Sequence, residues 1–187
     1  MRYLAGRGIT IPTPLALRWA PVCRHPSGVE LPAMIARIDN IDAELSGIHR
    51  TFLRLDGSGK ADIEPVKAML GRAAGGAVRL APAAEMLMVA EGIETALATM
   101  QAMEMPAWAA LSTSGMEALA LPPMVRTIII LADNDANGAG QTAARTAAQR
   151  WLVEGRRVRI ALPPISGTDF ADVLAGHAYA EICDAVA

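Results

Sequence analysis

One stretch of the chain, residues 127–140, constrains the fold more than any other. Five apolar residues at positions 128–132 begin with three consecutive isoleucines, and a short continuous apolar run is typical of a strand buried on both faces of a parallel sheet. Asp133 and Asp135 follow the run, with Gly138, Gly140 and an Ala-rich stretch behind them. Because ligands of open α/β sheets collect where strands end and helices begin, this stretch predicts a buried strand that delivers two carboxylates to a binding site.

The second half of the chain alternates between strand-like and helix-like segments. Strands are expected at residues 86–90, 107–111, 127–132 and 157–162, and helices at residues 92–103, 114–121, 140–154 and 169–186. Four strands that alternate with four helices imply right-handed crossovers. We therefore expect residues 86–187 to form an α/β domain, with a mostly parallel four-stranded sheet flanked by helices.

Residues 1–85 predict a different, smaller unit. Residues 3–26 are Pro-rich and indicate a short helix and an extended arm, and strands are expected at residues 31–39, 47–55 and 77–80. A turn signal lies at residues 56–59, and residues 65–70 favour one or two helical turns. These segments predict a small N-terminal α+β region that ends near residue 85.

Composition and charge exclude several classes of protein. No apolar run approaches the ~20 residues of a membrane span, the first eight residues lack the apolar core of a signal peptide, and two cysteines are too few for a disulfide framework or a zinc ribbon. We expect a cytoplasmic protein without a membrane segment. Residues 1–85 hold eleven Lys and Arg against eight Asp and Glu, and residues 86–187 hold six against eleven; this layout suits nucleic-acid chemistry but lies within ordinary scatter.

Acidic residues follow three of the expected strands: Glu91 and Glu94, Asp133 and Asp135, and Asp169 and Asp172. Taken singly, the first and third pairs are explained by helix capping, because carboxylates are favourable at helix N-termini. The second pair is explained by a polar turn after a strand. Taken together, they lie at one edge of a parallel sheet, where they can converge on a hard cation such as Mg²⁺. A calcium loop starting at Asp133 is disfavoured, because its twelfth position is Ala144 instead of Glu and a strand precedes it where a helix is required.

These motifs carry a family resemblance. Glu91-Gly92-Ile93-Glu94, Asp133-Asn134-Asp135 with Gly138, and Asp169-Phe170-Ala171-Asp172 resemble the three acidic motifs of the Toprim domain, which bacterial primases, topoisomerases of types IA and II and some nucleases share. Within that family, residues 86–187 are similar to the primase-like branch found in phage and mobile-element primase–helicases. The segments before residue 86, including residues 47–53 and 59–61, are also similar to what precedes the Toprim domain in that branch.

The resemblance implies roles for individual residues. Glu91 matches the general acid/base and possible metal ligand, Asp133 and Asp135 match the metal-binding pair, and Asp169 matches the third-motif acid, with Asp172 as its alternative. Glu94, where many relatives have Asp, is a further candidate ligand. The cofactor implied is Mg²⁺ or Mn²⁺, which neutralises the charge that develops on phosphate oxygens during transfer.

The function implied is Mg²⁺-dependent nucleotidyl transfer, as the catalytic module of a DNA primase that makes RNA primers from NTPs on a single-stranded DNA template. A separate helicase or zinc-binding module is an expected partner. A Toprim nuclease that cuts phosphodiesters and a non-catalytic nucleic-acid-binding protein remain the alternatives.

Basic and aromatic residues give weaker signals. The candidates for phosphate or nucleic-acid contact are Lys60, Lys67, His49, Arg50 and Arg72. Lys60 leads because it follows the Gly-rich turn, although the spacing is not that of a P-loop. Aromatic residues are 4% of the chain, so we interpret Trp19, Trp108 and Trp151 as core or rim residues instead of base-stacking platforms.

Overall fold

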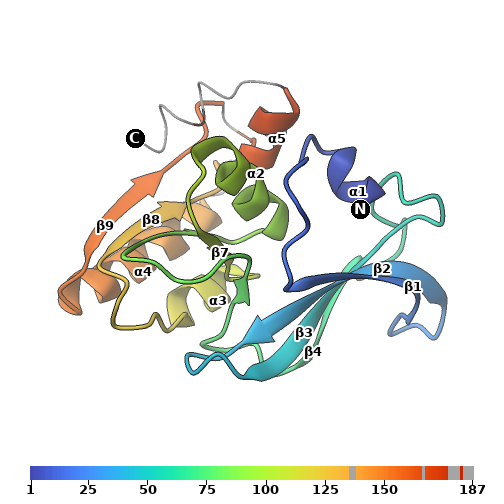
Figure 1. Cartoon of the computed structure of the whole chain (residues 1–187), viewed down its shortest axis with the longest axis horizontal. Coiled ribbons are helices and arrows are strands. Elements are labelled where there is room, and N and C mark those ends of the chain that lie inside the picture. Colours follow the sequence, from blue (N-terminus) through green and yellow to red (C-terminus); the bar gives the residue numbers. More distant parts are fainter. Residues whose placement is uncertain (135–137, 166, 177–181, 183–187) are drawn as a thin grey trace.

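A computed structural model describes residues 1–134, 138–165, 167–176 and 182. The described chain is built around two sheets that lie side by side (Figure 1). One sheet has four strands in the order β1-β2-β3-β4, and the other has five in the order β5-β7-β6-β8-β9. No described helix is both long and apolar enough to cross a membrane.

The N-terminal sheet is antiparallel throughout. A short helix, α1 (Arg2–Ala5), precedes β1 (Leu17–Arg24), β2 (Glu30–Asp39), β3 (Leu45–Phe52) and β4 (Lys67–Gly71). The predicted extended arm is therefore the edge strand β1.

The helical turns predicted at residues 65–70 are wrong, because this segment forms β4. The local preference of a Lys-Ala-Met-Leu run for helix is worth only tenths of a kcal/mol per residue, and the backbone hydrogen bonds to β3 override it. The pairing also requires glycine at one crossing, since a Cβ atom on Gly47 would lie 2.8 Å from the carbonyl oxygen of Leu70.

The C-terminal sheet is the predicted mostly parallel one. Its parallel strands are β6 (Met86–Ala90), β7 (Ala107–Ala109), β8 (Thr127–Leu131) and β9 (Arg157–Ala161), and β5 (Val78–Arg79) adds an antiparallel edge next to β7. The connecting helices are α2 (Ile93–Met103), α3 (Thr113–Ala118) and α4 (Ala139–Val153), and α5 (Phe170–Ala175) follows β9. The end of the helix predicted at residues 169–186 falls largely outside the described residues.

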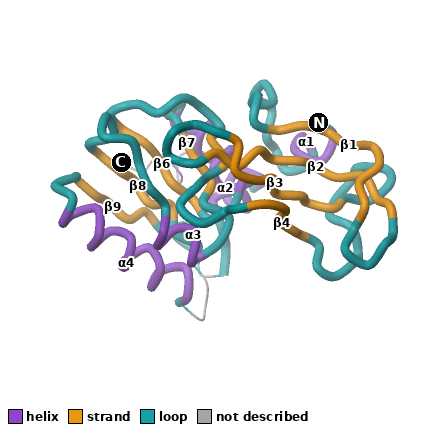
Figure 2. Tube along the Cα trace, turned by 90° about the horizontal axis from the view of Figure 1, so that it is seen from below, coloured by secondary structure: helices purple, strands orange, loops and turns teal. Residues whose placement is uncertain are grey.

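Alternate residues of the central strand feed two separate cores. Ile129 and Leu131 pack with α2 and α5 on one face of the sheet, and Ile128 and Ile130 pack with α3 and α4 on the other. Figure 2 shows α3 and α4 lying together over their face. All five residues of β8 are buried, as the unbroken apolar run predicts, and each fully buried isoleucine contributes about 1.5–3 kcal/mol of transfer free energy.

The core on the α2 and α5 face continues into the N-terminal sheet. Leu17, Met34 and Ala36 from that sheet belong to the same buried cluster as Leu97 of α2 and Phe170 of α5. The two sheets therefore share one apolar interior, and the loops at the carboxyl ends of β6 and β8 face residues from the N-terminal segment.

Candidate active site

A small polar cavity lies where the carboxyl ends of the parallel strands meet the N-terminal segment. Its volume is about 90 Å³, and it is lined by Arg7, Lys60, Lys67, Glu91, Gly92, Glu94, Thr95, Leu111, Asp133 and Asp169. Four of the predicted acidic residues and two of the predicted basic residues therefore border the same space. Asp135 lies outside the described residues.

Glu91 owes its position to a sharp strand-to-helix transition. It follows β6 directly, and Gly92 is the N-cap of α2 with an extended backbone. A Cβ atom on residue 92 would lie 3.1 Å from the Thr95 hydroxyl oxygen, so glycine keeps this turn tight. The carbonyl oxygen of Glu91 accepts a hydrogen bond of 2.9 Å from the Leu111 N–H, which holds the ends of β6 and β7 together.

Hydrogen bonds between two loops bring Asp133 and Asp169 together. The Asn134 N–H donates to the Thr168 carbonyl (3.2 Å), and the Gly167 N–H donates to the Asn134 carbonyl (2.7 Å). The Asn134 side chain also donates to the Pro163 carbonyl (3.0 Å). The loop after β8 is thereby tied to the loop after β9, which places both aspartates at one cavity.

Asp169 also caps a helix, as the capping interpretation of the sequence predicts. Its side chain accepts from the Asp172 N–H (2.9 Å), and the Asp172 carboxylate accepts from the Asp169 N–H (3.2 Å), which completes a reciprocal capping box at α5. Burial raises the pKa of Asp169 above its ordinary value. Capping and cavity lining are thus compatible in this residue.

Glu94 is buried and held by partners from the N-terminal segment. Its Oε1 atom accepts a 2.5 Å hydrogen bond from the Tyr3 hydroxyl and lies 3.4 Å from Lys60 Nζ. Burial by itself raises the pKa of Glu94, but the charges of Lys60 and Lys67 and the Tyr3 hydrogen bond outweigh it and lower the pKa to about 2. Glu94 is therefore ionised, and its negative charge is stabilised by Tyr3, Lys60 and Lys67 of the same chain.

The predicted basic residues divide into two groups. Lys60 and Lys67 line the cavity. Arg72 is exposed just after β4, and Arg50 donates to the Arg24 carbonyl (3.0 Å) and lies over the Phe52 ring. His49 is buried within β3, and burial followed by the charge of Lys67 lowers its pKa to about 4, so it is neutral near pH 7.

Sequence analysis missed two residues at this site, Tyr3 and Arg7. Arg7 borders the cavity and forms a 3.2 Å ion pair with Asp172, and Tyr3 reaches Glu94. No sequence signal marks them, because α1 ends at Ala5 and Arg7 lies in the turn that follows it. Their partners are 91 and 165 residues away, which no local pattern encodes.

The cavity suits a hard divalent cation in the type of its donors. Mg²⁺ takes one or two carboxylates and completes its shell with water and substrate phosphate, and Glu91 and Asp133 offer such carboxylates. Among the described residues, no three His, Cys, Asp or Glu side chains are grouped closely enough to form a metal site by themselves.

Comparison with known families assigns this fold. A model of the Toprim domain matches residues 86–179, which is half of the chain, and the chain therefore belongs to the Toprim family. A domain of unknown function (DUF7146) matches residues 1–80. No curated protein matches the sequence.

Solved structures with a similar fold include several primase fragments. The primase fragment of the bacteriophage T7 primase-helicase protein superposes with a TM-score of 0.62 at 16% identity, covering 89% of this chain and 65% of that one. A DNA primase domain from Pseudomonas aeruginosa gives 0.56 at 18% identity, with 97% and 58% covered. The DnaG primase catalytic domain bound to ssDNA gives 0.56 at 17% identity, with 98% and 73% covered. The chain spans about three fifths of the first two fragments, and at these identities the likeness establishes the fold.

Proposed function

We propose that the chain is the catalytic module of a DNA primase, which synthesises RNA primers on single-stranded DNA by nucleotidyl transfer dependent on Mg²⁺ or Mn²⁺. The observation that carries the proposal is the composition of the cavity. Carboxylates from the parallel sheet (Glu91, Asp133 and Asp169) face cations from the N-terminal segment (Arg7, Lys60 and Lys67) across one small space. A reaction between two anionic substrates requires this combination of acids and cations.

Glu91 and Asp133 are the residues that would hold the divalent ion, with Asp135 as a further ligand and Asp169 as the third-motif acid. A divalent ion bound there would neutralise charge on the attacking and leaving oxygens of phosphoryl transfer. Glu94 has a different role in this proposal. Because Tyr3 and Lys60 already engage its Oε1 atom, it anchors the Lys60 ammonium group at the cavity.

The remaining steps belong to side chains of the chain itself. Lys60 and Lys67 bind the phosphates of the incoming NTP, and Arg7 supports them from the turn after α1. Glu91 takes the proton of the primer 3′-hydroxyl as its oxygen bonds to the α-phosphorus and pyrophosphate leaves. His49 does not act as a phosphate-binding cation here, because it is buried and neutral.

The proposal extends to organisation and partners. The division between the N-terminal region and the Toprim domain falls near residue 85. One structural neighbour is the primase part of a primase-helicase protein, and another comprises the zinc-binding and RNA polymerase domains of the Aquifex aeolicus primase. A helicase or a zinc-binding module, encoded in cis or in trans, is accordingly the expected partner, within the cytoplasm and in the context of phage or mobile-element replication.

The test is incorporation of radiolabelled NTPs on single-stranded DNA. Asp133→Ala and Asp135→Ala should each abolish incorporation, whereas Glu85→Gln should leave it unchanged, because Glu85 lies exposed at the opposite end of β6. Incorporation that survives both aspartate substitutions would contradict the proposal. Nicking of plasmid DNA with Mn²⁺ but without priming would identify the nuclease alternative, and absence of Mg²⁺ and Mn²⁺ binding in the presence of nucleotide would identify a non-catalytic protein.

A further inference from the structure

An aromatic side chain on the inner face of the N-terminal sheet is left uncovered. Trp19 pairs with Met34 across the β1–β2 ladder, and Leu17 pairs with Ala36, so all four side chains lie on one face of the sheet. Leu17, Met34 and Ala36 are buried, but Trp19 is 44% exposed. Trp108 and Trp151, in contrast, are 1% and 0% exposed. Trp19 is therefore a rim residue whose indole reaches solvent.

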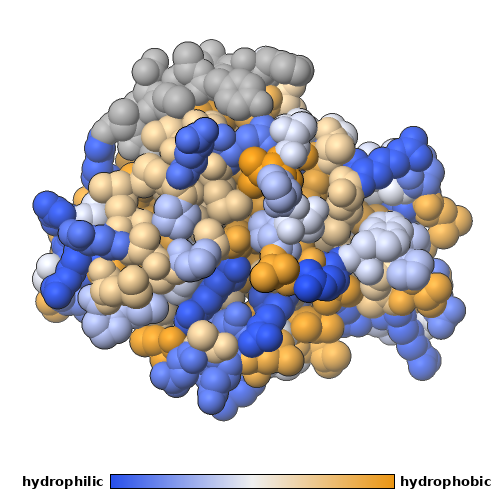
Figure 3. Space-filling view, in the orientation of Figure 1, coloured by the Kyte–Doolittle hydropathy of each residue, from blue (hydrophilic) through white to orange (hydrophobic). Residues whose placement is uncertain are grey.

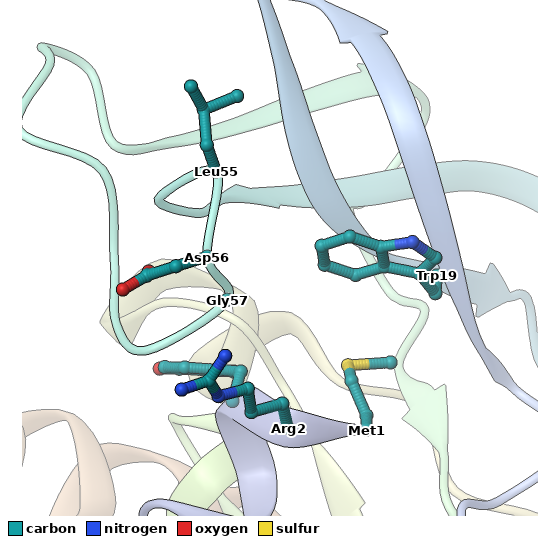
Figure 4. A pocket seen from close by; sticks show the side chains of 7 residues that line it. Met1, Arg2, Trp19, Leu55, Asp56 and Gly57 are labelled. Atoms are coloured by element: carbon teal, nitrogen blue, oxygen red, sulfur yellow. The ribbon is translucent and has the colours of Figure 1, made fainter.

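The exposed indole forms one wall of a cavity of about 270 Å³. Met1 and Arg2 border the lower side of this cavity, and the turn of residues 55–57 forms the wall opposite Trp19 (Figure 4). In Figure 4 the six-membered ring of Trp19 points toward this turn, while the side chains of Leu55 and Asp56 point away from the ring. Gly57 contributes no side chain, so the turn places no side chain between itself and the indole.

This aromatic cavity adjoins the candidate active site through a basic one. Tyr3 borders both the aromatic cavity and a second cavity of about 400 Å³, which is also lined by Arg7, Arg54 and Lys60. Arg7 and Lys60 in turn border the acidic cavity that contains Glu91 and Asp133. An aromatic, a basic and an acidic cavity therefore lie in sequence along the line where the N-terminal segment meets the Toprim domain.

We propose that Trp19 stacks on a base of a single-stranded nucleic acid whose adjoining phosphate lies at Arg54 in the basic cavity, while Arg7 and Lys60, which also border the acidic cavity, remain with the phosphates of the NTP. This assignment deepens the proposed function, on which it rests for the identity of the acidic cavity as the reaction site. Proteins that hold single strands without reading their sequence combine a positively charged groove with an aromatic ring on which a base stacks. The strand would then run from Trp19 toward Asp133.

The cations of the basic cavity that adjoins Trp19 favour nucleic acid over a protein partner. The carboxylate of Asp56 points away from the ring, and Arg2 and Arg54 lie close enough to stabilise its charge. Met1 and Leu55, the latter 82% exposed, are the other apolar side chains that line the cavity. On the face seen in Figure 3, strongly hydrophobic residues are interspersed with hydrophilic ones.

Equilibrium binding to a 12-nucleotide oligo(dT) and to an abasic strand of the same length tests the proposal. Measurements use the Asp133→Asn protein without divalent metal, so that turnover plays no part. Trp19→Ala should weaken oligo(dT) binding about tenfold and leave abasic-strand binding unchanged, because stacking on one aromatic ring accounts for a factor of this size. Trp19→Phe should retain most of the affinity. Val22→Ala, on the same strand and 63% exposed outside the cavity, should bind oligo(dT) like the parent.

Intrinsic fluorescence supplies a second readout. Since the other two tryptophans are buried, quenching by oligo(dT) should come from Trp19 and vanish in Trp19→Phe. Unchanged oligo(dT) affinity in Trp19→Ala, or an equal loss on the abasic strand, would overturn the proposal. A change in sedimentation of the chain alone, with DNA affinity retained, would overturn it in favour of a protein contact. Stacking is measured without metal and primer synthesis requires metal. A negative result in one experiment therefore does not affect the other, and the two proposals are tested separately.

Discussion

The Tyr3 hydroxyl donates a hydrogen bond of 2.5 Å to Oε1 of Glu94, and this bond joins residues 91 positions apart in the sequence. It connects α1 to the first turn of α2, directly beside the candidate active site. Both side chains are buried, with 3% and 5% of their surface exposed. The N-terminal segment is therefore part of the wall of the active-site cavity, and its contacts influence both stability and activity.

Replacing Tyr3 with phenylalanine should destabilise the fold by about 1.5–3 kcal/mol, the range for hydrogen bonds to charged groups. The ring still fills its space in this variant, so the loss reports the hydroxyl group alone. Urea denaturation at pH 7 measures the change. Leu15→Ala, at a position 87% exposed, is the control and should shift the free energy of unfolding by less than about 0.5 kcal/mol. Equal stability of Tyr3→Phe and the parent would show that the bond contributes nothing.

Asp169 offers a pair of substitutions that separate capping from charge. Asp169→Asn keeps an N-cap side chain and should lose little stability, whereas Asp169→Ala should lose about 0.5–2 kcal/mol because the Asp172 N–H loses its acceptor. Thermal unfolding measures both. If the carboxylate also serves the reaction, both variants should lose primer synthesis to a similar extent. Full activity in the stable Asp169→Asn variant would restrict the residue to capping.

The sequence predicts structure best within regular elements, where the order of apolar and polar residues follows the geometry of the strand or helix. The apolar run 128–131 predicts a buried strand, and parallel-sheet geometry then predicts that Asp133 and Asp169 share an edge. The helical turns predicted at residues 65–70 are wrong because the side chains of β4 are mostly exposed. Pairing with β3 decides the structure of this segment, and no apolar alternation marks it as a strand.

Contacts between distant segments could not be predicted in the same way. Tyr3 and Arg7 contribute to the site through Glu94 and Asp172, and these pairs form only once the N-terminal segment lies against α2 and α5. The exposure of Trp19 likewise depends on which other segments of the chain pack against β1. The sequence shows that residue 19 is a tryptophan, but it does not show which residues surround the indole.

His49 should make the protein less stable as the pH falls from about 6.5 to about 4. Burial, assisted by the nearby charge of Lys67, lowers its pKa to about 4 from an ordinary value of 6.5. Between these values the unfolded chain binds a proton that the folded chain does not, so the free energy of unfolding decreases as the pH decreases. The loss is on the order of 3 kcal/mol at most. Urea denaturation between pH 7 and pH 4.5 measures it.

His49→Leu is the matched control for this pH dependence, because leucine is similar in volume and does not titrate. The stability of the variant should change less over the same range, because the contribution of His49 is absent. Parallel curves for the two proteins would contradict the assignment to His49.

Binding of Mn²⁺ in the presence of NTP should distinguish a metal ligand from an anchoring carboxylate. Asp133→Asn should weaken Mn²⁺ binding by at least about tenfold, since even residues that only support a metal ligand have effects of this size. Glu94→Gln should leave the affinity within about threefold, because Tyr3 and Lys60 already occupy Oε1 of Glu94.

For the free energy of unfolding the order of the two variants should be reversed, with the larger effect in Glu94→Gln. Glu94→Gln removes a buried charge from its two partners and should lower the free energy of unfolding by about 1–2 kcal/mol, a range reduced because the Lys60 side chain is 36% exposed. Asp133→Asn, a change of one atom type at the cavity edge, should alter it less. Titration calorimetry and urea denaturation measure the two quantities. A Glu94→Gln variant that loses Mn²⁺ binding while keeping its stability would make Glu94 a ligand instead of an anchor.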